Sequence, residues 1–78
     1  MRDVVVYLAR ALVDEPDRVT VEELPGGRGV TYEIRTAPDD VGKLIGRGGR
    51  TVKALRKVIK GVAPEGRRVE VEVLAEGE

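Results

Sequence analysis

The chain has 78 residues, so we expect a single folded unit over residues 1–78 with a thin core, ordered over about 3–74. It lacks cysteine, histidine, serine, asparagine, glutamine, phenylalanine and tryptophan. This excludes disulfides, thiolate metal sites and the usual imidazole, serine or cysteine catalysis. The 14 basic residues balance the 14 acidic ones, which argues weakly against nucleic acid, because its binders often have a pI above about 9. We expect no enzyme, cofactor or metal site, although carboxylate chemistry stays open.

Residues 3–14 have the spacing of an amphipathic helix. Val5, Leu8, Ala9 and Leu12 recur at the interval that places them on one face, so we expect this stripe to be core. Pro16 should end the helix, because the residue before a proline is disfavoured in the helical conformation.

Two strands are predicted next, at residues 18–24 and 29–35. Both alternate apolar and polar residues with a period of two. The glycine-rich stretch at 25–29 predicts a tight hairpin between them. The inward-facing residues are expected to be Val19, Val21, Val30, Tyr32 and Ile34.

A short helix is predicted at residues 38–45. Pro38 suits a first helical turn, and Asp39 and Asp40 suit the positive end of the helix. We interpret these two acids as capping residues and not as a metal or acid/base pair. Gly46 is expected to end the helix.

A second helix is predicted at residues 50–60, followed by a loop at 61–66 and a last strand at 67–74. On the strand, the valines should face inward, and Glu70 and Glu72 should face solvent. Residues 75–78 are expected to be frayed. The inward residues of the helix are expected to be Val52, Leu55, Val58 and Ile59.

The element order is therefore α-β-β-α-α-β, an α+β fold. The first two strands should be antiparallel because a hairpin joins them, and the crossover through two helices should make the second and third parallel. Each strand has one apolar side, so the three helices should cover one face of a three-stranded mixed sheet.

No apolar run approaches the ~20 residues that a membrane helix needs. The first residues also lack the plan of a signal peptide. We therefore expect a cytoplasmic protein.

The charges are strongly segregated along the chain. Between residues 41 and 63 there are basic residues and no acids, and the rest of the chain carries the compensating negative charge. A charge run is usually a solvated face, but one without any acid favours a polyanionic partner. The basic residues are Lys43, Arg47, Arg50, Lys53, Arg56, Lys57 and Lys60.

Two segments fit the pattern G-x-x-G. Gly26–Gly29 lies between predicted strands and is interpreted as a hairpin turn, whereas Gly46–Gly49 lies between predicted helices. A helix N-terminus has unpaired N–H groups and partial positive charge, which make an anion site. Glycines let a sugar-phosphate chain approach the backbone. The second segment could also be a plain helix–helix connector.

The segment 45–52, I-G-R-G-G-R-T-V, resembles the I-G-x-x-G core of KH domains, and the element order resembles their type II topology. The stretches around it, 37–46 and 49–56, are similar to the KhpA family of small bacterial single-KH proteins. The resemblance covers residues 3–74. It implies single-stranded RNA binding as an RNA chaperone or regulator. It also implies a homodimer, or a heterodimer with a KhpB (Jag/EloR)-type protein, in connection with cell shape and cell wall organisation.

The predicted RNA site follows the glycine loop and its flanks. Gly48 departs from the family pattern, in which a basic or polar residue is common, so one fewer side chain contacts phosphate. Tyr32 should face the core and Tyr7 lies on the first helix, so neither is a stacking platform. The predicted RNA-binding residues are Lys43, Ile45, Gly46, Arg47, Gly48, Gly49, Arg50 and Lys53, with Leu44, Val52, Arg67 and Arg68 as possible groove edges.

An alternative function stays open. The KH surface could mainly dock a larger RNA-binding partner, with little RNA binding of its own. An exposed apolar patch, for example on helix 3–14, would favour that reading.

Overall fold

The computed structural model describes residues 1–64 and 66–77. The first helix, α1, spans Arg2–Leu12, and buries Val5 and Ala9 against the sheet. It ends earlier than predicted, because Val13 is already extended. Pro16 instead begins a short 3₁₀ turn, η1, at Pro16–Arg18.

The sheet has three strands in the order β1-β2-β3. Strand β1 (Thr20–Gly26) pairs antiparallel with β2 (Gly29–Thr36), and β2 pairs parallel with β3 (Arg68–Ala75). Gly26 faces Gly29 across the hairpin, which leaves a two-residue turn. Its first residue, Gly27, has φ 57°, as the type II′ turn of right-twisted hairpins requires. The predicted mixed sheet is confirmed.

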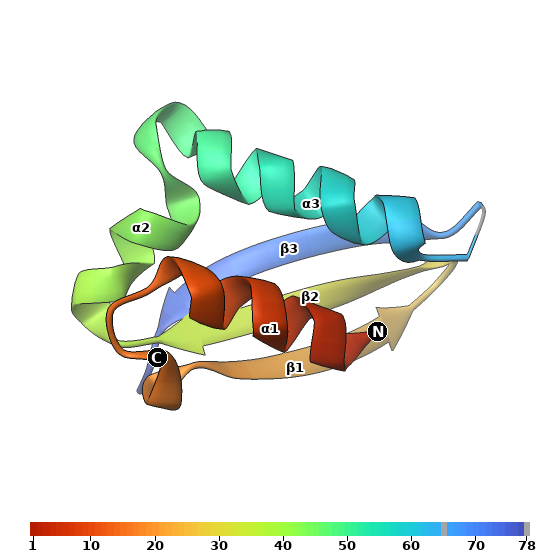
Figure 1. The fold of residues 1–78 in the computed structure, drawn as a ribbon. Helices are drawn as coiled ribbons and strands as arrows, with labels where there is room; N and C mark the ends of the chain where they lie inside the picture. Colours follow the sequence, from red (N-terminus) through yellow and green to blue (C-terminus); the bar gives the residue numbers. More distant parts are fainter. Residues whose placement is uncertain (65, 78) are drawn as a thin grey trace.

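Two further helices complete the predicted order. A 3₁₀ turn, η2 (Pro38–Asp40), leads into α2 (Val41–Ile45), and a second one, η3 (Arg47–Gly49), leads into α3 (Arg50–Val62). All three α-helices lie on one side of the sheet (Figure 1). None of the helices in residues 1–64 and 66–77 is long and apolar enough to cross a membrane.

The core lies between the helices and the inner face of the sheet. Along β2, every second residue is buried, as the period of two predicts. Tyr32 is 2% exposed and faces the core as predicted, next to Ile34 and, from α3, Leu55 and Ile59. Each such aliphatic side chain contributes roughly 1.5–3 kcal/mol by leaving water, so this single layer of contacts supplies most of the stability.

Two residues predicted to be core are exposed. Leu12 is 42% exposed and Val58 is 51% exposed. Leu12 lies at the last residue of α1, where the helix leaves the sheet. Val58 precedes the buried Ile59 and lies about 100° around α3 from it. The predictions of inward side chains at these two positions are wrong.

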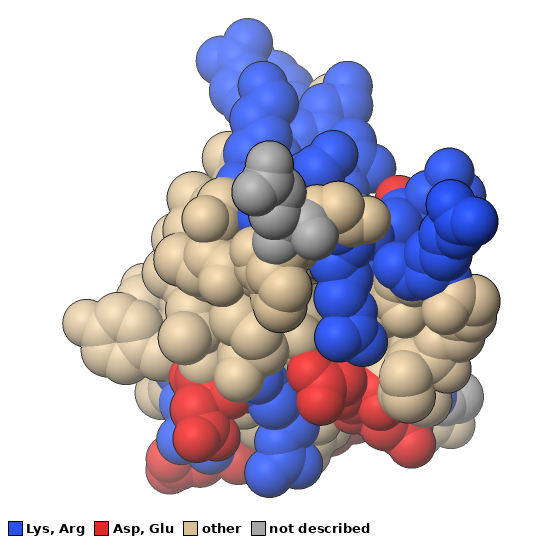
Figure 2. Space-filling model, turned by 90° about the vertical axis from the view of Figure 1, so that its right-hand side faces the viewer, with Lys and Arg blue, Asp and Glu red and all other residues tan. Residues whose placement is uncertain are grey.

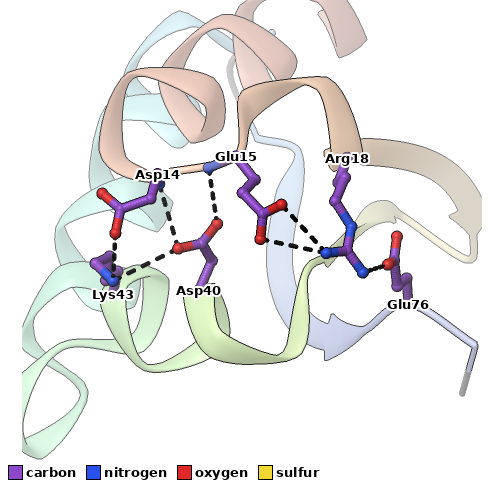
Figure 3. Close-up of polar contacts among 6 residues, drawn as sticks. All are labelled: Asp14, Glu15, Arg18, Asp40, Lys43 and Glu76. Atoms are coloured by element: carbon purple, nitrogen blue, oxygen red, sulfur yellow. Dashed lines mark hydrogen bonds and ion pairs between the residues drawn. The ribbon is translucent and has the colours of Figure 1, made fainter.

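The C-terminal segment is ordered further than predicted. Strand β3 continues to Ala75, and the N–H of Glu76 donates a hydrogen bond to the carbonyl of Thr36 at 2.8 Å. The carboxylate of Glu76 also pairs with the guanidinium of Arg18 (Figure 3). The expected fraying is therefore wrong for residues 75 and 76, and its last position, 78, lies outside the described residues.

Candidate nucleic-acid interface

The loop Gly46–Gly49 has a backbone that only glycine adopts readily. Gly46 ends α2 with φ 76°, and its N–H donates to the carbonyl of Gly42 at 2.8 Å. Gly48 and Gly49 have φ 65° and 79°. Residues with a Cβ are disfavoured at such angles by about 1–2 kcal/mol each. The glycines therefore determine the path of the chain from α2 into α3.

The first and third residues of the loop have different surroundings. A Cβ on Gly46 would lie 2.3 Å from Oγ1 of Thr51 and 2.7 Å from its backbone nitrogen, so this glycine is packed against the first turn of α3. A Cβ on Gly48 would have no atom within 4 Å. The backbone at Gly48 is therefore open to a ligand, next to the N-terminal N–H groups of α3.

Basic side chains surround this loop. Arg47, Arg50 and Lys53 are exposed, and within the part of the chain that the structure describes none of them forms an ion pair. The side chain of Lys53 extends back towards the loop, since its Cε would lie 3.9 Å from a Cβ on Gly49. The structure thus brings together three of the predicted cations around the open backbone.

Further cations continue along the exposed side of α3. Viewed from the hairpin end, Lys and Arg side chains gather over α3, whereas the acidic side chains in view lie mostly at the opposite side, with further Lys and Arg among them (Figure 2). Arg56 is the one α3 cation with an ion pair among the described residues, at 4.0 Å from Glu70 of β3. The segregation read from the sequence therefore becomes one positive face.

Lys43 lies apart from this face. Its ammonium contacts a carboxylate oxygen of Asp14 at 3.0 Å and one of Asp40 at 3.5 Å (Figure 3). The hydrogen bond and charge of Asp14, with a smaller contribution from Asp40, raise the pKa of Lys43. Its charge is already compensated within the protein, so it differs from the other cations of the predicted site.

Asp40 has a role that the sequence did not reveal. Its carboxylate is 1% exposed and accepts hydrogen bonds from the backbone N–H groups of Asp14 and Glu15, at 3.2 and 3.0 Å. Burial alone would raise the pKa of Asp40, but these two N–H groups and Lys43 outweigh it, and the pKa is lowered. Asp40 stands at the N-cap position of α2, as its place at the helix start predicts, but its carboxylate makes no capping bond to the helix, so the expected side-chain cap is wrong. The carboxylate joins the α1–β1 connection to the base of α2 (Figure 3).

The predicted groove edges separate into three groups. Leu44 is fully buried in the core, so its prediction as a groove edge is wrong. Val52 is partly exposed after the loop, and Ile45, one of the predicted RNA-binding residues, is partly exposed before it. Arg67 and Arg68 are exposed where β3 begins, at the far end of α3 from the loop.

Comparisons with known proteins give a consistent result. The family model described as "KhpA/KhpB, KH domain" matches residues 2–73. Relatives named "RNA-binding protein KhpA" include one from Mycobacterium leprae, 49% identical over 88% of this chain and 86% of that protein. One from Clostridium acetobutylicum is 44% identical over 95% of this chain and 100% of that protein. One from Chlamydia pneumoniae is 38% identical over 97% of this chain and 99% of that protein.

A solved structure has the same fold. It is the crystal structure of Era in complex with MgGDPNP and nucleotides 1506–1542 of 16S ribosomal RNA, with a TM-score of 0.56. The alignment covers 94% of this chain at 23% identity but only 28% of the Era chain. At this identity the likeness shows the fold alone.

Proposed function

This chain belongs to the KhpA family of RNA-binding proteins with a KH domain, and we propose that it binds the backbone of single-stranded RNA with the loop Gly46–Gly49. The observation that carries the proposal is the open backbone at Gly48 with Arg47, Arg50 and Lys53 around it. The family is one of RNA-binding proteins and not of enzymes.

The loop is suited to phosphate for two physical reasons. The N-terminal N–H groups of α3 carry partial positive charge, and the glycines let phosphate oxygens approach them. Exposed arginine side chains then add charge-assisted hydrogen bonds. Lys43 is expected to contribute least, because Asp14 and Asp40 already compensate its charge.

Bases would contact the protein more weakly than phosphates do. Ile45 and Val52 offer small apolar surfaces beside the loop, and KH modules hold about four nucleotides. Tyr32 is buried and Tyr7 lies on α1, so neither provides the stacking platform of other single-strand binders. We expect weak base selectivity and, for two or three neutralised phosphates, a log–log salt slope of roughly −1.5 to −2.

The wider role follows from the family and stays a proposal. We propose a cytoplasmic RNA chaperone or post-transcriptional regulator connected with cell shape and cell wall organisation. A single KH domain binds RNA weakly, so pairing with a second copy or with a KhpB-type protein would raise its affinity by linking two sites.

The loop mechanism is tested by Arg47→Asp/Gly48→Asp. The variant places negative charge where phosphate is proposed to bind, and a Cβ at Gly48 meets no atom within 4 Å. Aspartate also tolerates positive φ better than most residues. We expect the fold to persist by circular dichroism and the affinity for a four-nucleotide oligouridylate to fall at least tenfold, in line with charge reversal at contacted phosphates.

The hairpin offers a matched control, Gly27→Asp/Arg28→Asp. It has the same residue types, a similar φ of 57° at Gly27 and likewise no atom within 4 Å of the new Cβ. This control should leave the affinity for the four-nucleotide RNA within about twofold of wild type, because it lies outside the four-nucleotide footprint. Undiminished binding by a folded loop variant would overturn the proposal.

A second candidate function, a protein-docking subunit, is favoured by an exposed apolar patch on α1 and α3. Leu12, Val58 and Val62 are 42%, 51% and 57% exposed. A shallow pocket of about 270 Å³ lies between the two helices, lined by Leu12, Leu55 and Val58 among others. Such a patch indicates contact with another protein surface.

Val58→Lys tests the docking candidate. A lysine there would leave a charge in any apolar contact with another copy or with a KhpB-type protein, so complexes formed by the purified chain should dissociate in sedimentation. Leu24→Lys is the matched control, since Leu24 is 40% exposed but lies on β1. A wild-type chain that stays monomeric at all concentrations, alone and with the partner, would remove this candidate.

A further inference from the structure

The tip of the β1–β2 hairpin is packed against the start of β3. The N–H of Arg68 donates to the carbonyl of Arg28 at 3.3 Å. A Cβ on Gly29 would lie 2.5 Å from the carbonyl oxygen of Arg68, so the two backbones are in close contact. Both segments turn at a glycine of positive φ, Gly27 at 57° and Gly66 at 83°. The two turns are therefore held together at one end of the sheet.

Three exposed arginines, Arg28, Arg67 and Arg68, lie on these two segments. None of them forms an ion pair with a residue in 1–64 or 66–77. The nearby carboxylate of Glu70 is engaged elsewhere, 4.0 Å from Arg56 of α3. Neighbouring positive charges repel one another, and a bound anion relieves that repulsion.

A pocket of about 490 Å³ is lined by two of these arginines, Arg28 and Arg68. Its lining includes the hairpin backbone Gly26–Gly29, Gly66, Arg68 and the carboxylate residue Glu70. Because the glycines lack side chains, a ligand in the pocket can approach the main chain closely. Backbone and arginine donors at one place suit a phosphate group.

The hairpin tip, which lines this pocket, and the loop Gly46–Gly49 lie at opposite ends of α3 (Figure 1). The helix has 13 residues and is therefore about 20 Å long. Four nucleotides at the stacked spacing of about 3.4 Å cover only about 14 Å. Between the two ends, α3 carries the exposed cations Lys53, Arg56, Lys57 and Lys60.

We propose that the hairpin tip and the start of β3 form a second contact site for RNA phosphate, through Arg28 and Arg68. This inference rests on the proposed function, because the site extends the same RNA strand beyond the four nucleotides held at Gly46–Gly49. The segment Gly26–Gly29, a turn in the sheet, thereby also takes part in binding.

The test compares oligouridylates of four and twelve nucleotides by fluorescence anisotropy. Arg28→Ala and Arg28→Ala/Arg68→Ala should lower the affinity for the twelve-nucleotide RNA by about threefold and about tenfold, the size of exposed charge contacts. The salt slope should become shallower by about 0.7 for each contact removed. Affinity for the four-nucleotide RNA should stay within twofold. Arg10→Ala, an exposed arginine of α1, is the matched control.

The outcomes separate this inference from the proposed function. Twelve-nucleotide affinity and salt slope that stay unchanged in a folded Arg28→Ala/Arg68→Ala variant would overturn the second site, while the loop variant could still abolish binding. An equal fall for both RNA lengths, or an equal effect of Arg10→Ala, would also overturn it. If wild type binds neither RNA, the proposed function and the inference both fail.

Discussion

The two G-x-x-G segments of this chain have the same pattern, but different glycines in each are required by the structure. In the hairpin, Gly27 alone has positive φ, and Gly29 is required because the backbone of Arg68 lies against it. In the loop, Gly46, Gly48 and Gly49 all have positive φ, and it is the first glycine that packs closely, against Thr51. The pattern therefore does not define the conformation; the neighbouring elements do.

The difference also explains why the loop is the stronger candidate for phosphate. In the loop, the chain leaves one helix and begins another, so the open backbone at Gly48 lies beside the N-terminus of α3, which carries partial positive charge. In the hairpin, most backbone groups are used by strand pairing, and arginine side chains have to supply the donors.

The largest expected effect is a difference in stability between substitutions at the first glycine of each segment. Gly46→Ala combines positive φ with a Cβ 2.3 Å from Thr51 Oγ1, so it should destabilise the fold by about 3 kcal/mol. Gly26→Ala meets no atom within 4 Å and has no positive φ, so it should change stability by less than about 0.5 kcal/mol. Urea unfolding measures both. Equal effects would show that the closeness of Gly46 to Thr51 is unimportant.

At the last glycine of each segment, the larger loss of stability is expected in the hairpin and not in the loop. Gly29→Ala would place its Cβ 2.5 Å from a backbone oxygen of β3, which should cost about 2 kcal/mol. Gly49→Ala has only the strain of φ 79° and one distant contact, which should cost about 1 kcal/mol. Thermal or urea unfolding of the pair checks the order, and a larger loss for Gly49→Ala would contradict it.

The smallest effect is the pH dependence of stability that comes from Asp40, the buried carboxylate at the start of α2. Asp40→Asn removes the charge that holds the α1–β1 connection to α2. Because the folded pKa of Asp40 lies below the ordinary value of 3.8, its stabilisation is present above that pH and disappears as pH falls through the folded pKa. Wild type should exceed Asp40→Asn in stability at pH 6, and the gap should close towards pH 2.

Asp39→Asn provides the control for that measurement, because Asp39 is the exposed neighbour of Asp40. It should leave stability nearly unchanged at both pH values. A gap between wild type and Asp40→Asn that is the same at pH 6 and pH 2 would show that the buried charge is not the cause.

The alternating strands could be predicted closely from the sequence. The inward positions Val21, Val30, Tyr32 and Ile34 are buried as expected, because a period of two leaves only one assignment of faces. The buried faces of the helices were predicted less accurately. Leu44 fills the core instead of a groove edge, while Val58 is exposed, because the direction of a helix face depends on where the helix lies over the sheet.

The glycine loop was located correctly between two helices, but the positions of the charged side chains around it could not be derived from the pattern. The approach of Lys53 to Gly49 and the compensation of Lys43 by two carboxylates depend on side-chain positions. The hydrogen bonds of Asp40 with the α1–β1 connection join it to Asp14 and Glu15, which lie 26 and 25 positions earlier in the chain. No local sequence pattern predicts such a contact.

The sequence by itself determined the element order, the mixed sheet, the loop between helices and the cluster of cations, since each follows from local periodicity, glycine positions and charge spacing. Only the tertiary structure decided which glycines are required for space, which lysine is compensated and which arginines gather at the hairpin end. Those properties arise from close approaches between distant segments, such as Gly29 with Arg68 and Asp40 with Asp14.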